Sequence, residues 1–426
     1  MLYFKRLDIN ELDALPFEEK ERSCRNIVAQ LDQKLSNIPQ DREMLKKLEY
    51  FLPYLDKDGL CLLIDQLVFK DVFCGPTAFF IEKMLKQCKL LADSFDPTAT
   101  EQVTQFISRI QSEILQNPKK AFKSKGVNHI IRELLNSTRD KTKLLAAIAK
   151  VPLEYFLDDP TRLSTYKVYL DVLEGEPQTQ LCTKLIDYLE IEMLTSYQSF
   201  IYQKVCSVCN TSDKQRLFKK VSPHLPELAK DKVANYFVQS LIMNYPAAET
   251  FTLLVDSLGS LPSNSNVLFS LGLKACQDKH LVAVEYLVEN IWLKDMLIKR
   301  LLFNEKGGFD SKTHQLAIAL LSLTSKYLAD FQLEVISLYE KYWLFDKIGQ
   351  KVLIALFSKP IDPAIKSLLI GTMAKEFLGI MRTKGGPQLL TAIEKVSDFS
   401  TRKRIRLAIK NAPYQKRTLI KNSLDG

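Results

Sequence analysis

The sequence predicts an all-α fold built as a helical-repeat solenoid. Apolar residues recur at three- and four-residue spacing through nearly every segment, which is the period of a helix with one buried face. The segments are separated by short polar breaks, and no clear alternating strand is present. Only 14 glycines and 17 prolines occur among 426 residues, which is sparse for a β-protein with many turns. A long chain of helices with evenly short breaks favours a stacked array over a bundle.

Several long stretches keep the helical period for many turns. The clearest of them cover residues 180–206, 280–303 and 314–357. The breaks expected to be turns between helices fall at 96–100, 158–161, 260–266, 304–310 and 358–363. Because no linker-like change of composition divides the chain, we expect one elongated repeat domain over residues 1–426. Its expected parts are an N-terminal cap over about 1–60, repeats over about 61–400 and a basic C-terminal end over about 401–426.

Composition and charge limit the classes of protein to which the chain can belong. Lys and Arg total 59 against 50 for Asp and Glu, and the resulting net charge of +9 permits an anionic partner without requiring one. The eight cysteines are scattered and no secretory signal precedes them, so we expect reduced thiols in the nucleus or cytosol. No run of about 18 apolar residues occurs, so no membrane partner is expected.

The stretch from Asp231 to Ile242 carries the most specific pattern. Its predicted buried face consists of five apolar residues: Ala234, Phe237, Val238, Leu241 and Ile242. Asn235 and Gln239 lie four residues apart, so their amides should stand together on another face, with Tyr236 beside them. Two such amides can meet the hydrogen-bonding edge of a base, and the ring can stack on it. The alternative is that Tyr236 packs between helices while water solvates the amides.

The same motif recurs along the chain: a small or amide residue, a bulky one, two apolar residues and a polar one. Clear copies begin at Ala78, Asn128, Ser199 and Asn235, degraded copies at Gly349 and Gly386, and weaker echoes at Tyr166 and Thr313. Neighbouring copies are spaced like the units of helical-repeat proteins. Each copy is too small to bury its own apolar face, so the units are expected to stack.

These residues resemble a known family. "ANYFVQSLI" resembles the second helix of a Pumilio (PUF) repeat, and "GPTAFFIEKML", "GVNHIIRELL" and "GGPQLLTAIE" resemble diverged forms of it. The opening "LYFKRLDINELDALPFEEKERSCRNIVAQL", followed by "CGPTAFFIEKML" and "NHIIRELL", is similar to the nucleolar branch of this family, which binds the small-subunit rRNA precursor. "SNSNVLFSLGLKAC" and "GGPQLLTAIEKVSDFSTRKRIRLAIKNA" fit the later repeats of that branch.

The resemblance implies an all-α, right-handed superhelix (a Pumilio/armadillo-like solenoid) with RNA on its concave face. The first, second and fifth motif positions would face a single-stranded or partly structured RNA. For this branch the RNA is pre-rRNA in nucleolar small-subunit ribosome biogenesis, and binding restrains premature cleavage of the precursor. We therefore expect a nuclear, nucleolar monomer, with pre-ribosomal proteins as further candidate partners.

The resemblance assigns RNA-binding roles to three sets of side chains. Asn235, Tyr236 and Gln239 would favour uracil, and Ser199, Phe200 and Gln203 would favour adenine. The third set is Asn128, His129 and Arg132, in which His129 could stack while Arg132 binds a phosphate, a base or a carboxylate of the next helix. Phe79 and Glu82 form a weaker set. Leu170, Leu353 and Leu390 are apolar at the fifth position, so bases should be read in only a few repeats.

Two basic stretches suit contact with a phosphate backbone. The first contains Lys119, Lys120, Lys123 and Lys125, and the second contains Arg402, Lys403, Arg404, Arg406, Lys410, Lys416, Arg417 and Lys421. We expect RNA contact from both, with Lys123 and Lys125 leading in the first. The second could instead be a solvated tail or a nuclear-import signal around "RKRIR".

No pattern indicates catalysis, and we expect no enzyme activity, cofactor or metal. None of the four histidines stands in a metal-binding or nucleophilic motif, and no Gly-rich phosphate loop follows a strand. Cys206 and Cys209 form a CxxC without a second pair to complete a zinc site.

Two other functions stay open. A HEAT- or armadillo-like scaffold would hold a peptide or protein, and a cytoplasmic PUF regulator would bind mRNA. Recurring amides and rings at the motif positions favour RNA over the scaffold. Several motif copies have lost their polar residues, which favours the rRNA-binding branch over a PUF protein that binds a specific mRNA sequence.

Overall fold

The computed structural model describes residues 9–31, 42–66, 75–138, 140–191, 194, 198–262, 265–292, 296–304 and 306–410. The chain divides into two compact units, Met1–Arg216 (unit 1) and Leu217–Gly426 (unit 2). Within the described residues the regular structure is entirely helical, apart from one isolated bridge between Phe303 and Phe309. This confirms the predicted all-α fold class.

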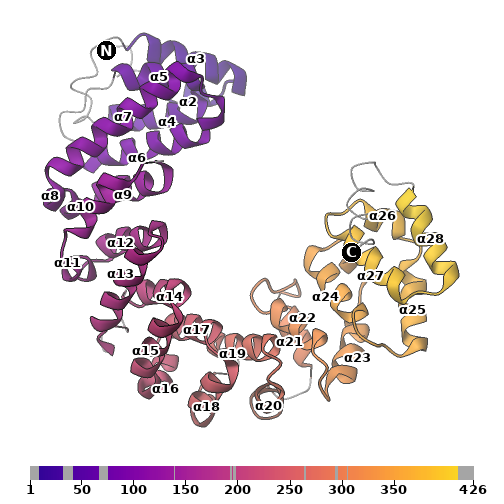
Figure 1. Cartoon of the computed structure of the whole chain (residues 1–426). Coiled ribbons are helices and arrows are strands. Elements are labelled where there is room, and N and C mark those ends of the chain that lie inside the picture. The colour runs from indigo at the N-terminus through magenta and orange to yellow at the C-terminus, as the bar shows by residue number, and fades with distance from the viewer. Residues whose placement is uncertain are drawn as a thin grey trace. The chain divides into compact units, whose positions relative to one another are not determined.

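Unit 1 contains two rows of helices (Figure 1). The helices that carry the sequence motif, with α4 ahead of them, pack side by side in what we call the motif row: α4 (Arg42–Phe51), α6 (Gly75–Leu90), α9 (Lys125–Ser137), α12 (Pro160–Val172) and α14 (Ser199–Val208). The supporting helices are α2 (Ile9–Asp13), α3 (Phe17–Ala29), α5 (Lys57–Gln66), α7 (Pro97–Gln116), α8 (Pro118–Lys123), α10 (Thr142–Ala149), α11 (Leu153–Leu157) and α13 (Glu176–Asp187). Helix α15 (Thr211–Val221) contains the boundary between the units.

Unit 2 repeats this arrangement (Figure 1). Its motif row is α17 (Asn235–Asn244), α19 (Asn266–Gln277), α22 (His314–Ser322), α24 (Lys347–Phe357) and α27 (Gly386–Val396), each in contact with the next. The supporting helices are α16 (Leu225–Lys230), α18 (Ala247–Leu258), α20 (Leu281–Tyr286), α21 (Leu297–Leu302), α23 (Leu328–Leu338), α25 (Pro363–Met373) and α26 (Phe377–Met381). Helix α28 (Phe399–Lys410) packs on α26 and α27.

Three of the predicted breaks contain helix starts of one kind. In each, an aspartate caps the helix and a proline occupies its first turn: Asp96–Pro97 for α7, Asp159–Pro160 for α12 and Asp362–Pro363 for α25. The Asp159 carboxylate accepts hydrogen bonds from the backbone N–H groups of Thr161 and Arg162. Proline fits there because the first N–H groups of a helix have no partner within it.

The longest predicted stretch, 314–357, is divided in the structure. It forms α22, α23, a 3₁₀ turn and α24. The apolar period continued across the first turn because the turn residues Leu323 and Tyr327 are themselves buried. The stretch 180–206 likewise divides into α13 and α14. Periodicity therefore located the helical regions but missed turns whose side chains belong to the core.

The predicted core face of α17 is confirmed. Ala234, Phe237, Val238, Leu241 and Ile242 are all fully buried. Four of them form two apolar doublets, Phe237–Val238 and Leu241–Ile242, which begin four residues apart, and Ala234 precedes them. The same pattern of buried doublets recurs on the other motif-row helices. Stacking these doublets between neighbouring helices is what makes the core continuous within each unit.

Helices α6 and α9 of the unit 1 motif row pack closely at Gly126. A Cβ atom added to Gly126 would lie 2.6 Å from Cβ of Ala78, so no side chain fits between the two helices there. This contact holds the exposed faces of α6 and α9 next to each other.

We predict that Phe237→Ala lowers the free energy of unfolding by about 3–5 kcal/mol, because it leaves a cavity in a fully buried site. The matched control is the neighbouring Tyr236→Ala, which removes an exposed ring and should change stability by under about 1 kcal/mol. Denaturant unfolding of both variants measures the difference. Equal losses would contradict the assignment of the two faces.

Candidate nucleic-acid interface

The buried doublets fix the register of the motif on every helix of the row. The second position precedes the first doublet by one residue, and the fifth position follows it. The second positions are exposed or half-exposed and include Phe79, His129, Phe200, Tyr236, Asn266, Gln315, Lys351 and Gln388. The rings of Phe79, Phe200 and Tyr236 are 43%, 47% and 47% exposed. Each motif row thus presents its second position to solvent.

This register corrects part of the sequence analysis. Leu170, Leu353 and Leu390, predicted at ligand-facing fifth positions, are fully buried core residues. On α24 and α27 the motif was aligned one residue too early, since glycine was taken for the small first residue. The burial pattern places Ile354 and Thr391 at the fifth positions instead.

Two predicted first-position residues are buried, which also corrects their assignment. Asn128 is 1% exposed, and its Nδ2 donates to the carbonyl oxygens of Phe122 and Ser124 at 2.8 and 2.9 Å. Its Oδ1 accepts a 2.9 Å hydrogen bond from Thr165 of α12. With the amide used in this way, Asn128 fixes the start of α9 and offers no free group to a base. Ser199 on α14 is fully buried as well.

The predicted trio on α17 is the best-formed set. Tyr236 is exposed, while Asn235 and Gln239 are partly exposed. Gln239 Nε2 donates to Asn235 Oδ1 at 2.9 Å, so the amides do stand together. Asn235 Nδ2 donates to the carbonyl of Asp231 at 2.7 Å, which leaves Gln239 as the more adaptable group. The three side chains present one ring beside an amide pair.

On α14 the predicted set is incomplete. Phe200 is exposed and Gln203 is partly exposed. The Gln203 Nε2 and Ser199 Oγ atoms are both buried without a hydrogen-bond partner in the described part of the chain. A buried donor without a partner costs free energy, so an acceptor that reached Gln203 Nε2 would be bound favourably.

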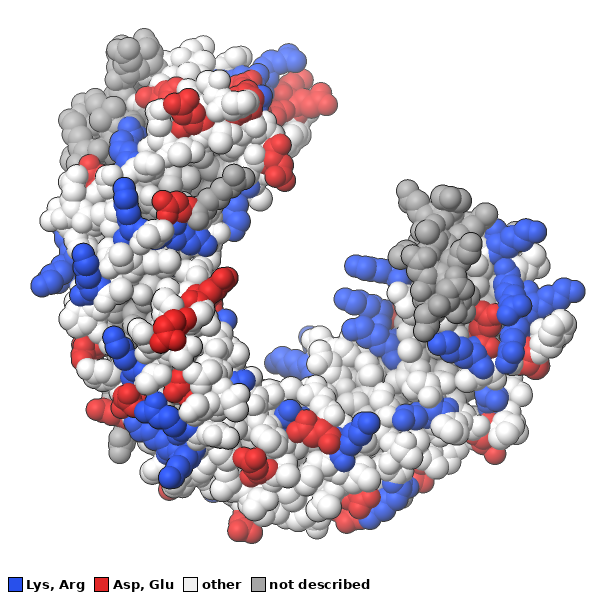
Figure 2. Space-filling model, viewed as in Figure 1, with Lys and Arg blue, Asp and Glu red and all other residues white. Residues whose placement is uncertain are grey.

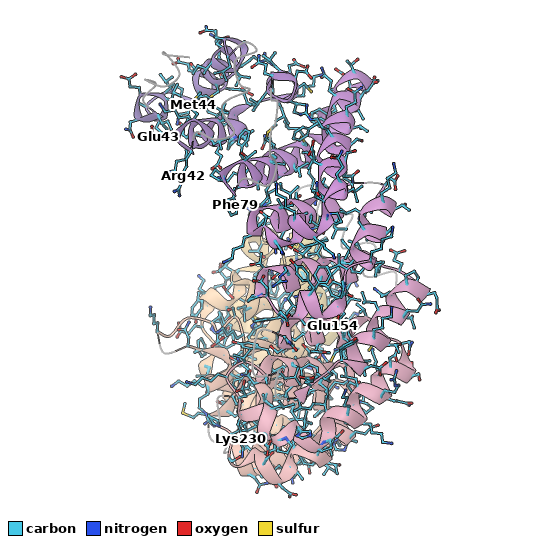
Figure 3. All side chains as sticks on the ribbon, turned by 90° about the vertical axis from the view of Figure 1, so that its left-hand side faces the viewer. Arg42, Glu43, Met44, Phe79, Glu154 and Lys230 are labelled. Atoms are coloured by element: carbon cyan, nitrogen blue, oxygen red, sulfur yellow. The ribbon has the colours of Figure 1, made fainter. Side chains whose placement is uncertain are left out.

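The two remaining predicted sets, His129 and Arg132 on α9 and Phe79 and Glu82 on α6, lie in contact in the structure. The rings of Phe79 and His129 meet edge to face with centroids 5.4 Å apart, and His129 Nδ1 lies 3.4 Å from Glu82 Oε2. Arg132 is half-buried, and burial lowers the pKa of its guanidinium while Glu82 opposes that change. Figure 3 shows Phe79 at the edge of unit 1, on the same side as Arg42 of α4.

Lys125 extends the α9 set into a basic strip. It is exposed and lies four residues before His129, which puts both on one face of α9 together with Arg132. Lys123, at the end of α8, is also exposed. The first predicted basic stretch therefore adjoins the ring pair.

In unit 2 three shallow cavities follow one another along the motif row. The first, of about 270 Å³, lies between α17, α19 and α22 and is lined by Gln239, Asn266, Phe269 and Gln315, among others. The second, of about 510 Å³, shares Leu273 and Gln315 with the first. The third, of about 370 Å³, shares Lys351 and Ile354 with the second. Because neighbouring cavities share walls, they form one groove across five helices, which we call the unit 2 groove.

Most residues of this groove were missed by the sequence analysis. They include Asn266, Phe269, Gln315 and Lys351, which occupy second or fifth positions. The motif of α19 begins with a small residue, Ser265, but has Asn266 where a bulky second residue was expected, and the motif of α22 begins with His314. On α24 the alignment on Gly349 hid the place of Lys351. Aligning the chain on the apolar doublets, which are more regular, would have found them.

The second predicted basic stretch lies on α28, where Lys and Arg side chains gather over the C-terminal helices (Figure 2). Arg402 donates to the Ser397 carbonyl, Arg404 to the Ala374 carbonyl, and Arg406 pairs with the nearly buried Glu394 at 2.7 Å. These bonds dock α28 onto the end of unit 2. Lys403 is exposed and free to meet a phosphate, and residues Lys416, Arg417 and Lys421 lie outside the described residues.

The described cysteines are buried, and burial raises the pKa of Cys209 to about 11 and of Cys182 to about 12. These thiols stay protonated at neutral pH, which suits core packing better than metal binding. Among the described residues no group of three His, Cys, Asp or Glu side chains could hold a metal ion. No helix in the described ranges has the length and apolar character needed to cross a membrane.

Comparison with known proteins gives the fold. No protein-family profile matches the chain, and no curated protein sequence matches it significantly. A structure of APUM23 with its insert region deleted, with GGAAUUGACGG, superposes with a TM-score of 0.65 at 16% identity and covers 99% of this chain and 95% of the other. APUM23 with GGAUUUGACGG gives a TM-score of 0.65 at 17% identity with the same coverage. The chain therefore has the Pumilio-type helical-repeat fold that its sequence predicts.

We predict that Asn128→Ala lowers the free energy of unfolding by about 1–3 kcal/mol, because buried carbonyl groups lose their donor. Asn266→Ala on α19 is the matched control, since that amide is exposed and should cost under about 0.5 kcal/mol. Thermal or denaturant unfolding compares the two. If Asn128→Ala keeps full stability, the structural role of this amide is refuted.

Proposed function

We propose that the protein binds single-stranded or partly structured RNA along its motif rows. The observation that carries the proposal is the unit 2 groove, which Gln239, Asn266 and Gln315 line together with Phe269. The exposed Tyr236 lies three residues before Gln239 on α17. Amides can pair with base edges, and rings can stack on base faces, whichever base is present. The bound sequences GGAAUUGACGG and GGAUUUGACGG of the structurally similar APUM23 support the same ligand class.

Charge along the motif rows also supports RNA. They carry lysine and arginine side chains near motif positions, among them Lys125, Arg132, Lys312, Lys347, Lys351 and Lys384. In Figure 2, Lys and Arg side chains project from the edge of unit 2 formed by α22, α24 and α27. A protein-binding scaffold has no general need for cations beside rings and amides.

The finer proposal is that the RNA is pre-rRNA, bound in the nucleolus during small-subunit ribosome biogenesis. There the protein would restrain premature cleavage of the precursor, alone or with pre-ribosomal proteins. The support is the resemblance of the N-terminal and C-terminal segments to the nucleolar Pumilio-like branch. Crosslinking in cells followed by sequencing of the attached RNA tests it: reads on rRNA precursor support it, and reads on messenger 3′ regions replace it with mRNA regulation.

The joint substitution of Asn235, Tyr236 and Gln239 by alanine should weaken binding of GGAAUUGACGG by about tenfold or more, since a stacked or paired base contributes about 1–3 kcal/mol. Fluorescence anisotropy measures the affinity. The control replaces three uncharged residues of the supporting helix α18 and the turn after it, Thr252, Ser257 and Ser260, and should bind like the unchanged protein. A folded triple variant with unaltered affinity would remove the trio from the interface.

Binding should also weaken steeply with salt. If about six phosphates are neutralised, the slope of log affinity against log salt should be about −4 for a single strand. Repeating the anisotropy titration between low and physiological salt measures this slope. A flat response would count against the basic motif rows as the contact surface.

A further inference from the structure

We propose that the third cavity of the unit 2 groove is a phosphate-binding pocket that grips the RNA backbone through Lys347, Lys351 and Lys384. The cavity lies between α24 and α27, and its apolar floor includes Ile354 and Phe345. The inference rests on the proposed function and assigns a distinct task to one end of the groove. Its ligand is any phosphodiester or terminal phosphate group that the bound strand brings to the cavity.

The charge of the cavity favours an anion. Lys347 and Lys351 reach it from α24 and Lys384 from the turn before α27, and none of its described lining residues is acidic. The three ammonium groups make no ion pair with any described residue. The adjacent Asp346 carboxylate is engaged at the start of α24, where it accepts hydrogen bonds from the backbone N–H groups of Ile348 and Gly349. The positive field in the cavity is therefore not neutralised from within the described part of the chain.

The arrangement of the lysines is unfavourable without a ligand. Lys347 and Lys351 stand four residues apart on one helix, a spacing at which like charges destabilise the helix. Lys384 then adds a third positive charge to the same cavity. A bound phosphate would convert this repulsion into attraction, so the site gains more from an anion than scattered surface lysines would.

The backbone around the cavity is held in place. Gln350 is buried, and its Nε2 donates to the Leu344 carbonyl and to Thr383 Oγ1, both at 2.6 Å. This bond ties α24 to the turn that carries Lys384. A Cβ at Gly385 would lie 2.5 Å from Gln350 Oε1, so the turn and the amide are in direct contact. The lysines thus project from a preorganised frame, which lowers the entropy cost of binding.

The chemistry of the groove changes along its length. The first cavity presents three amides, Gln239, Asn266 and Gln315, with one lysine. The third presents three lysines with two amides, Gln388 and Gln350, and Gln350 Nε2 already donates hydrogen bonds within the protein. Amides discriminate base edges, but lysines act as point charges that accept any phosphate. We infer that one end of the groove selects sequence while the other end holds the backbone without regard to sequence.

The decisive variant replaces Lys347, Lys351 and Lys384 by glutamine. It should bind GGAAUUGACGG about tenfold more weakly, and the salt slope should become shallower by about 0.7 for each phosphate released. A scrambled RNA of the same composition should lose affinity by the same factor. The control replaces Lys299, Lys375 and Lys395, three exposed lysines of unit 2 outside the groove, by glutamine and removes the same charge. Equal slopes for the two variants would overturn the proposal.

Lysine acylation followed by mass spectrometry separates failure of the pocket from failure of the proposed function. Protection of the three lysines of the unchanged protein by GGAAUUGACGG supports the pocket. Binding of the RNA without this protection refutes the pocket and leaves the proposed function standing. Protection by tripolyphosphate in a protein that binds no RNA refutes the proposed function, and with it the backbone grip, and identifies a site for a free phosphate compound. Protection by neither probe overturns the pocket.

Discussion

The burial of two apolar doublets on each motif-row helix is the constraint on which the rest of the structure depends. A single helix of ten to twelve residues is only marginally stable in water, so each one relies on the neighbours that cover its doublets. Once Phe237, Val238, Leu241 and Ile242 are fixed in the core, the helix has no rotational freedom left. The residue just before the first doublet must then face outward, whatever it is.

That constraint divides the motif into positions that bond within the protein and positions that can contact a ligand. The first position lies at the helix start, where its side chain can satisfy carbonyl groups of the preceding turn, as Asn128 and Gln350 do. The second position carries no such duty and varies between residues as different as Phe, His, Asn and Lys. The protein can therefore change what a repeat contacts without changing how the repeat packs.

Sequence reasoning found what depends on local chemistry. The helical period and the paired amides of Asn235 and Gln239 follow from spacing alone, and the structure bears them out. It failed where the motif can be aligned on the sequence in two ways. On α24 and α27 the glycines before Gln350 and Pro387 suggested a motif register that the burial pattern shows to be one residue off. It also failed at the third cavity, because Lys384 joins Lys347 and Lys351 only through the packing of α27 on α24.

The packing of α6 against α9 at Gly126 brings Phe79 and His129 together, which limits how an RNA strand could run along unit 1. Intercalation of a base between two aromatic rings requires a gap of about 7 Å, twice the van der Waals thickness of a ring. The Phe79 and His129 centroids are 5.4 Å apart, so the pair as it stands leaves no room for a base between its rings. A nucleotide arriving there would have to stack on the outside of the pair or turn one of the two rings aside.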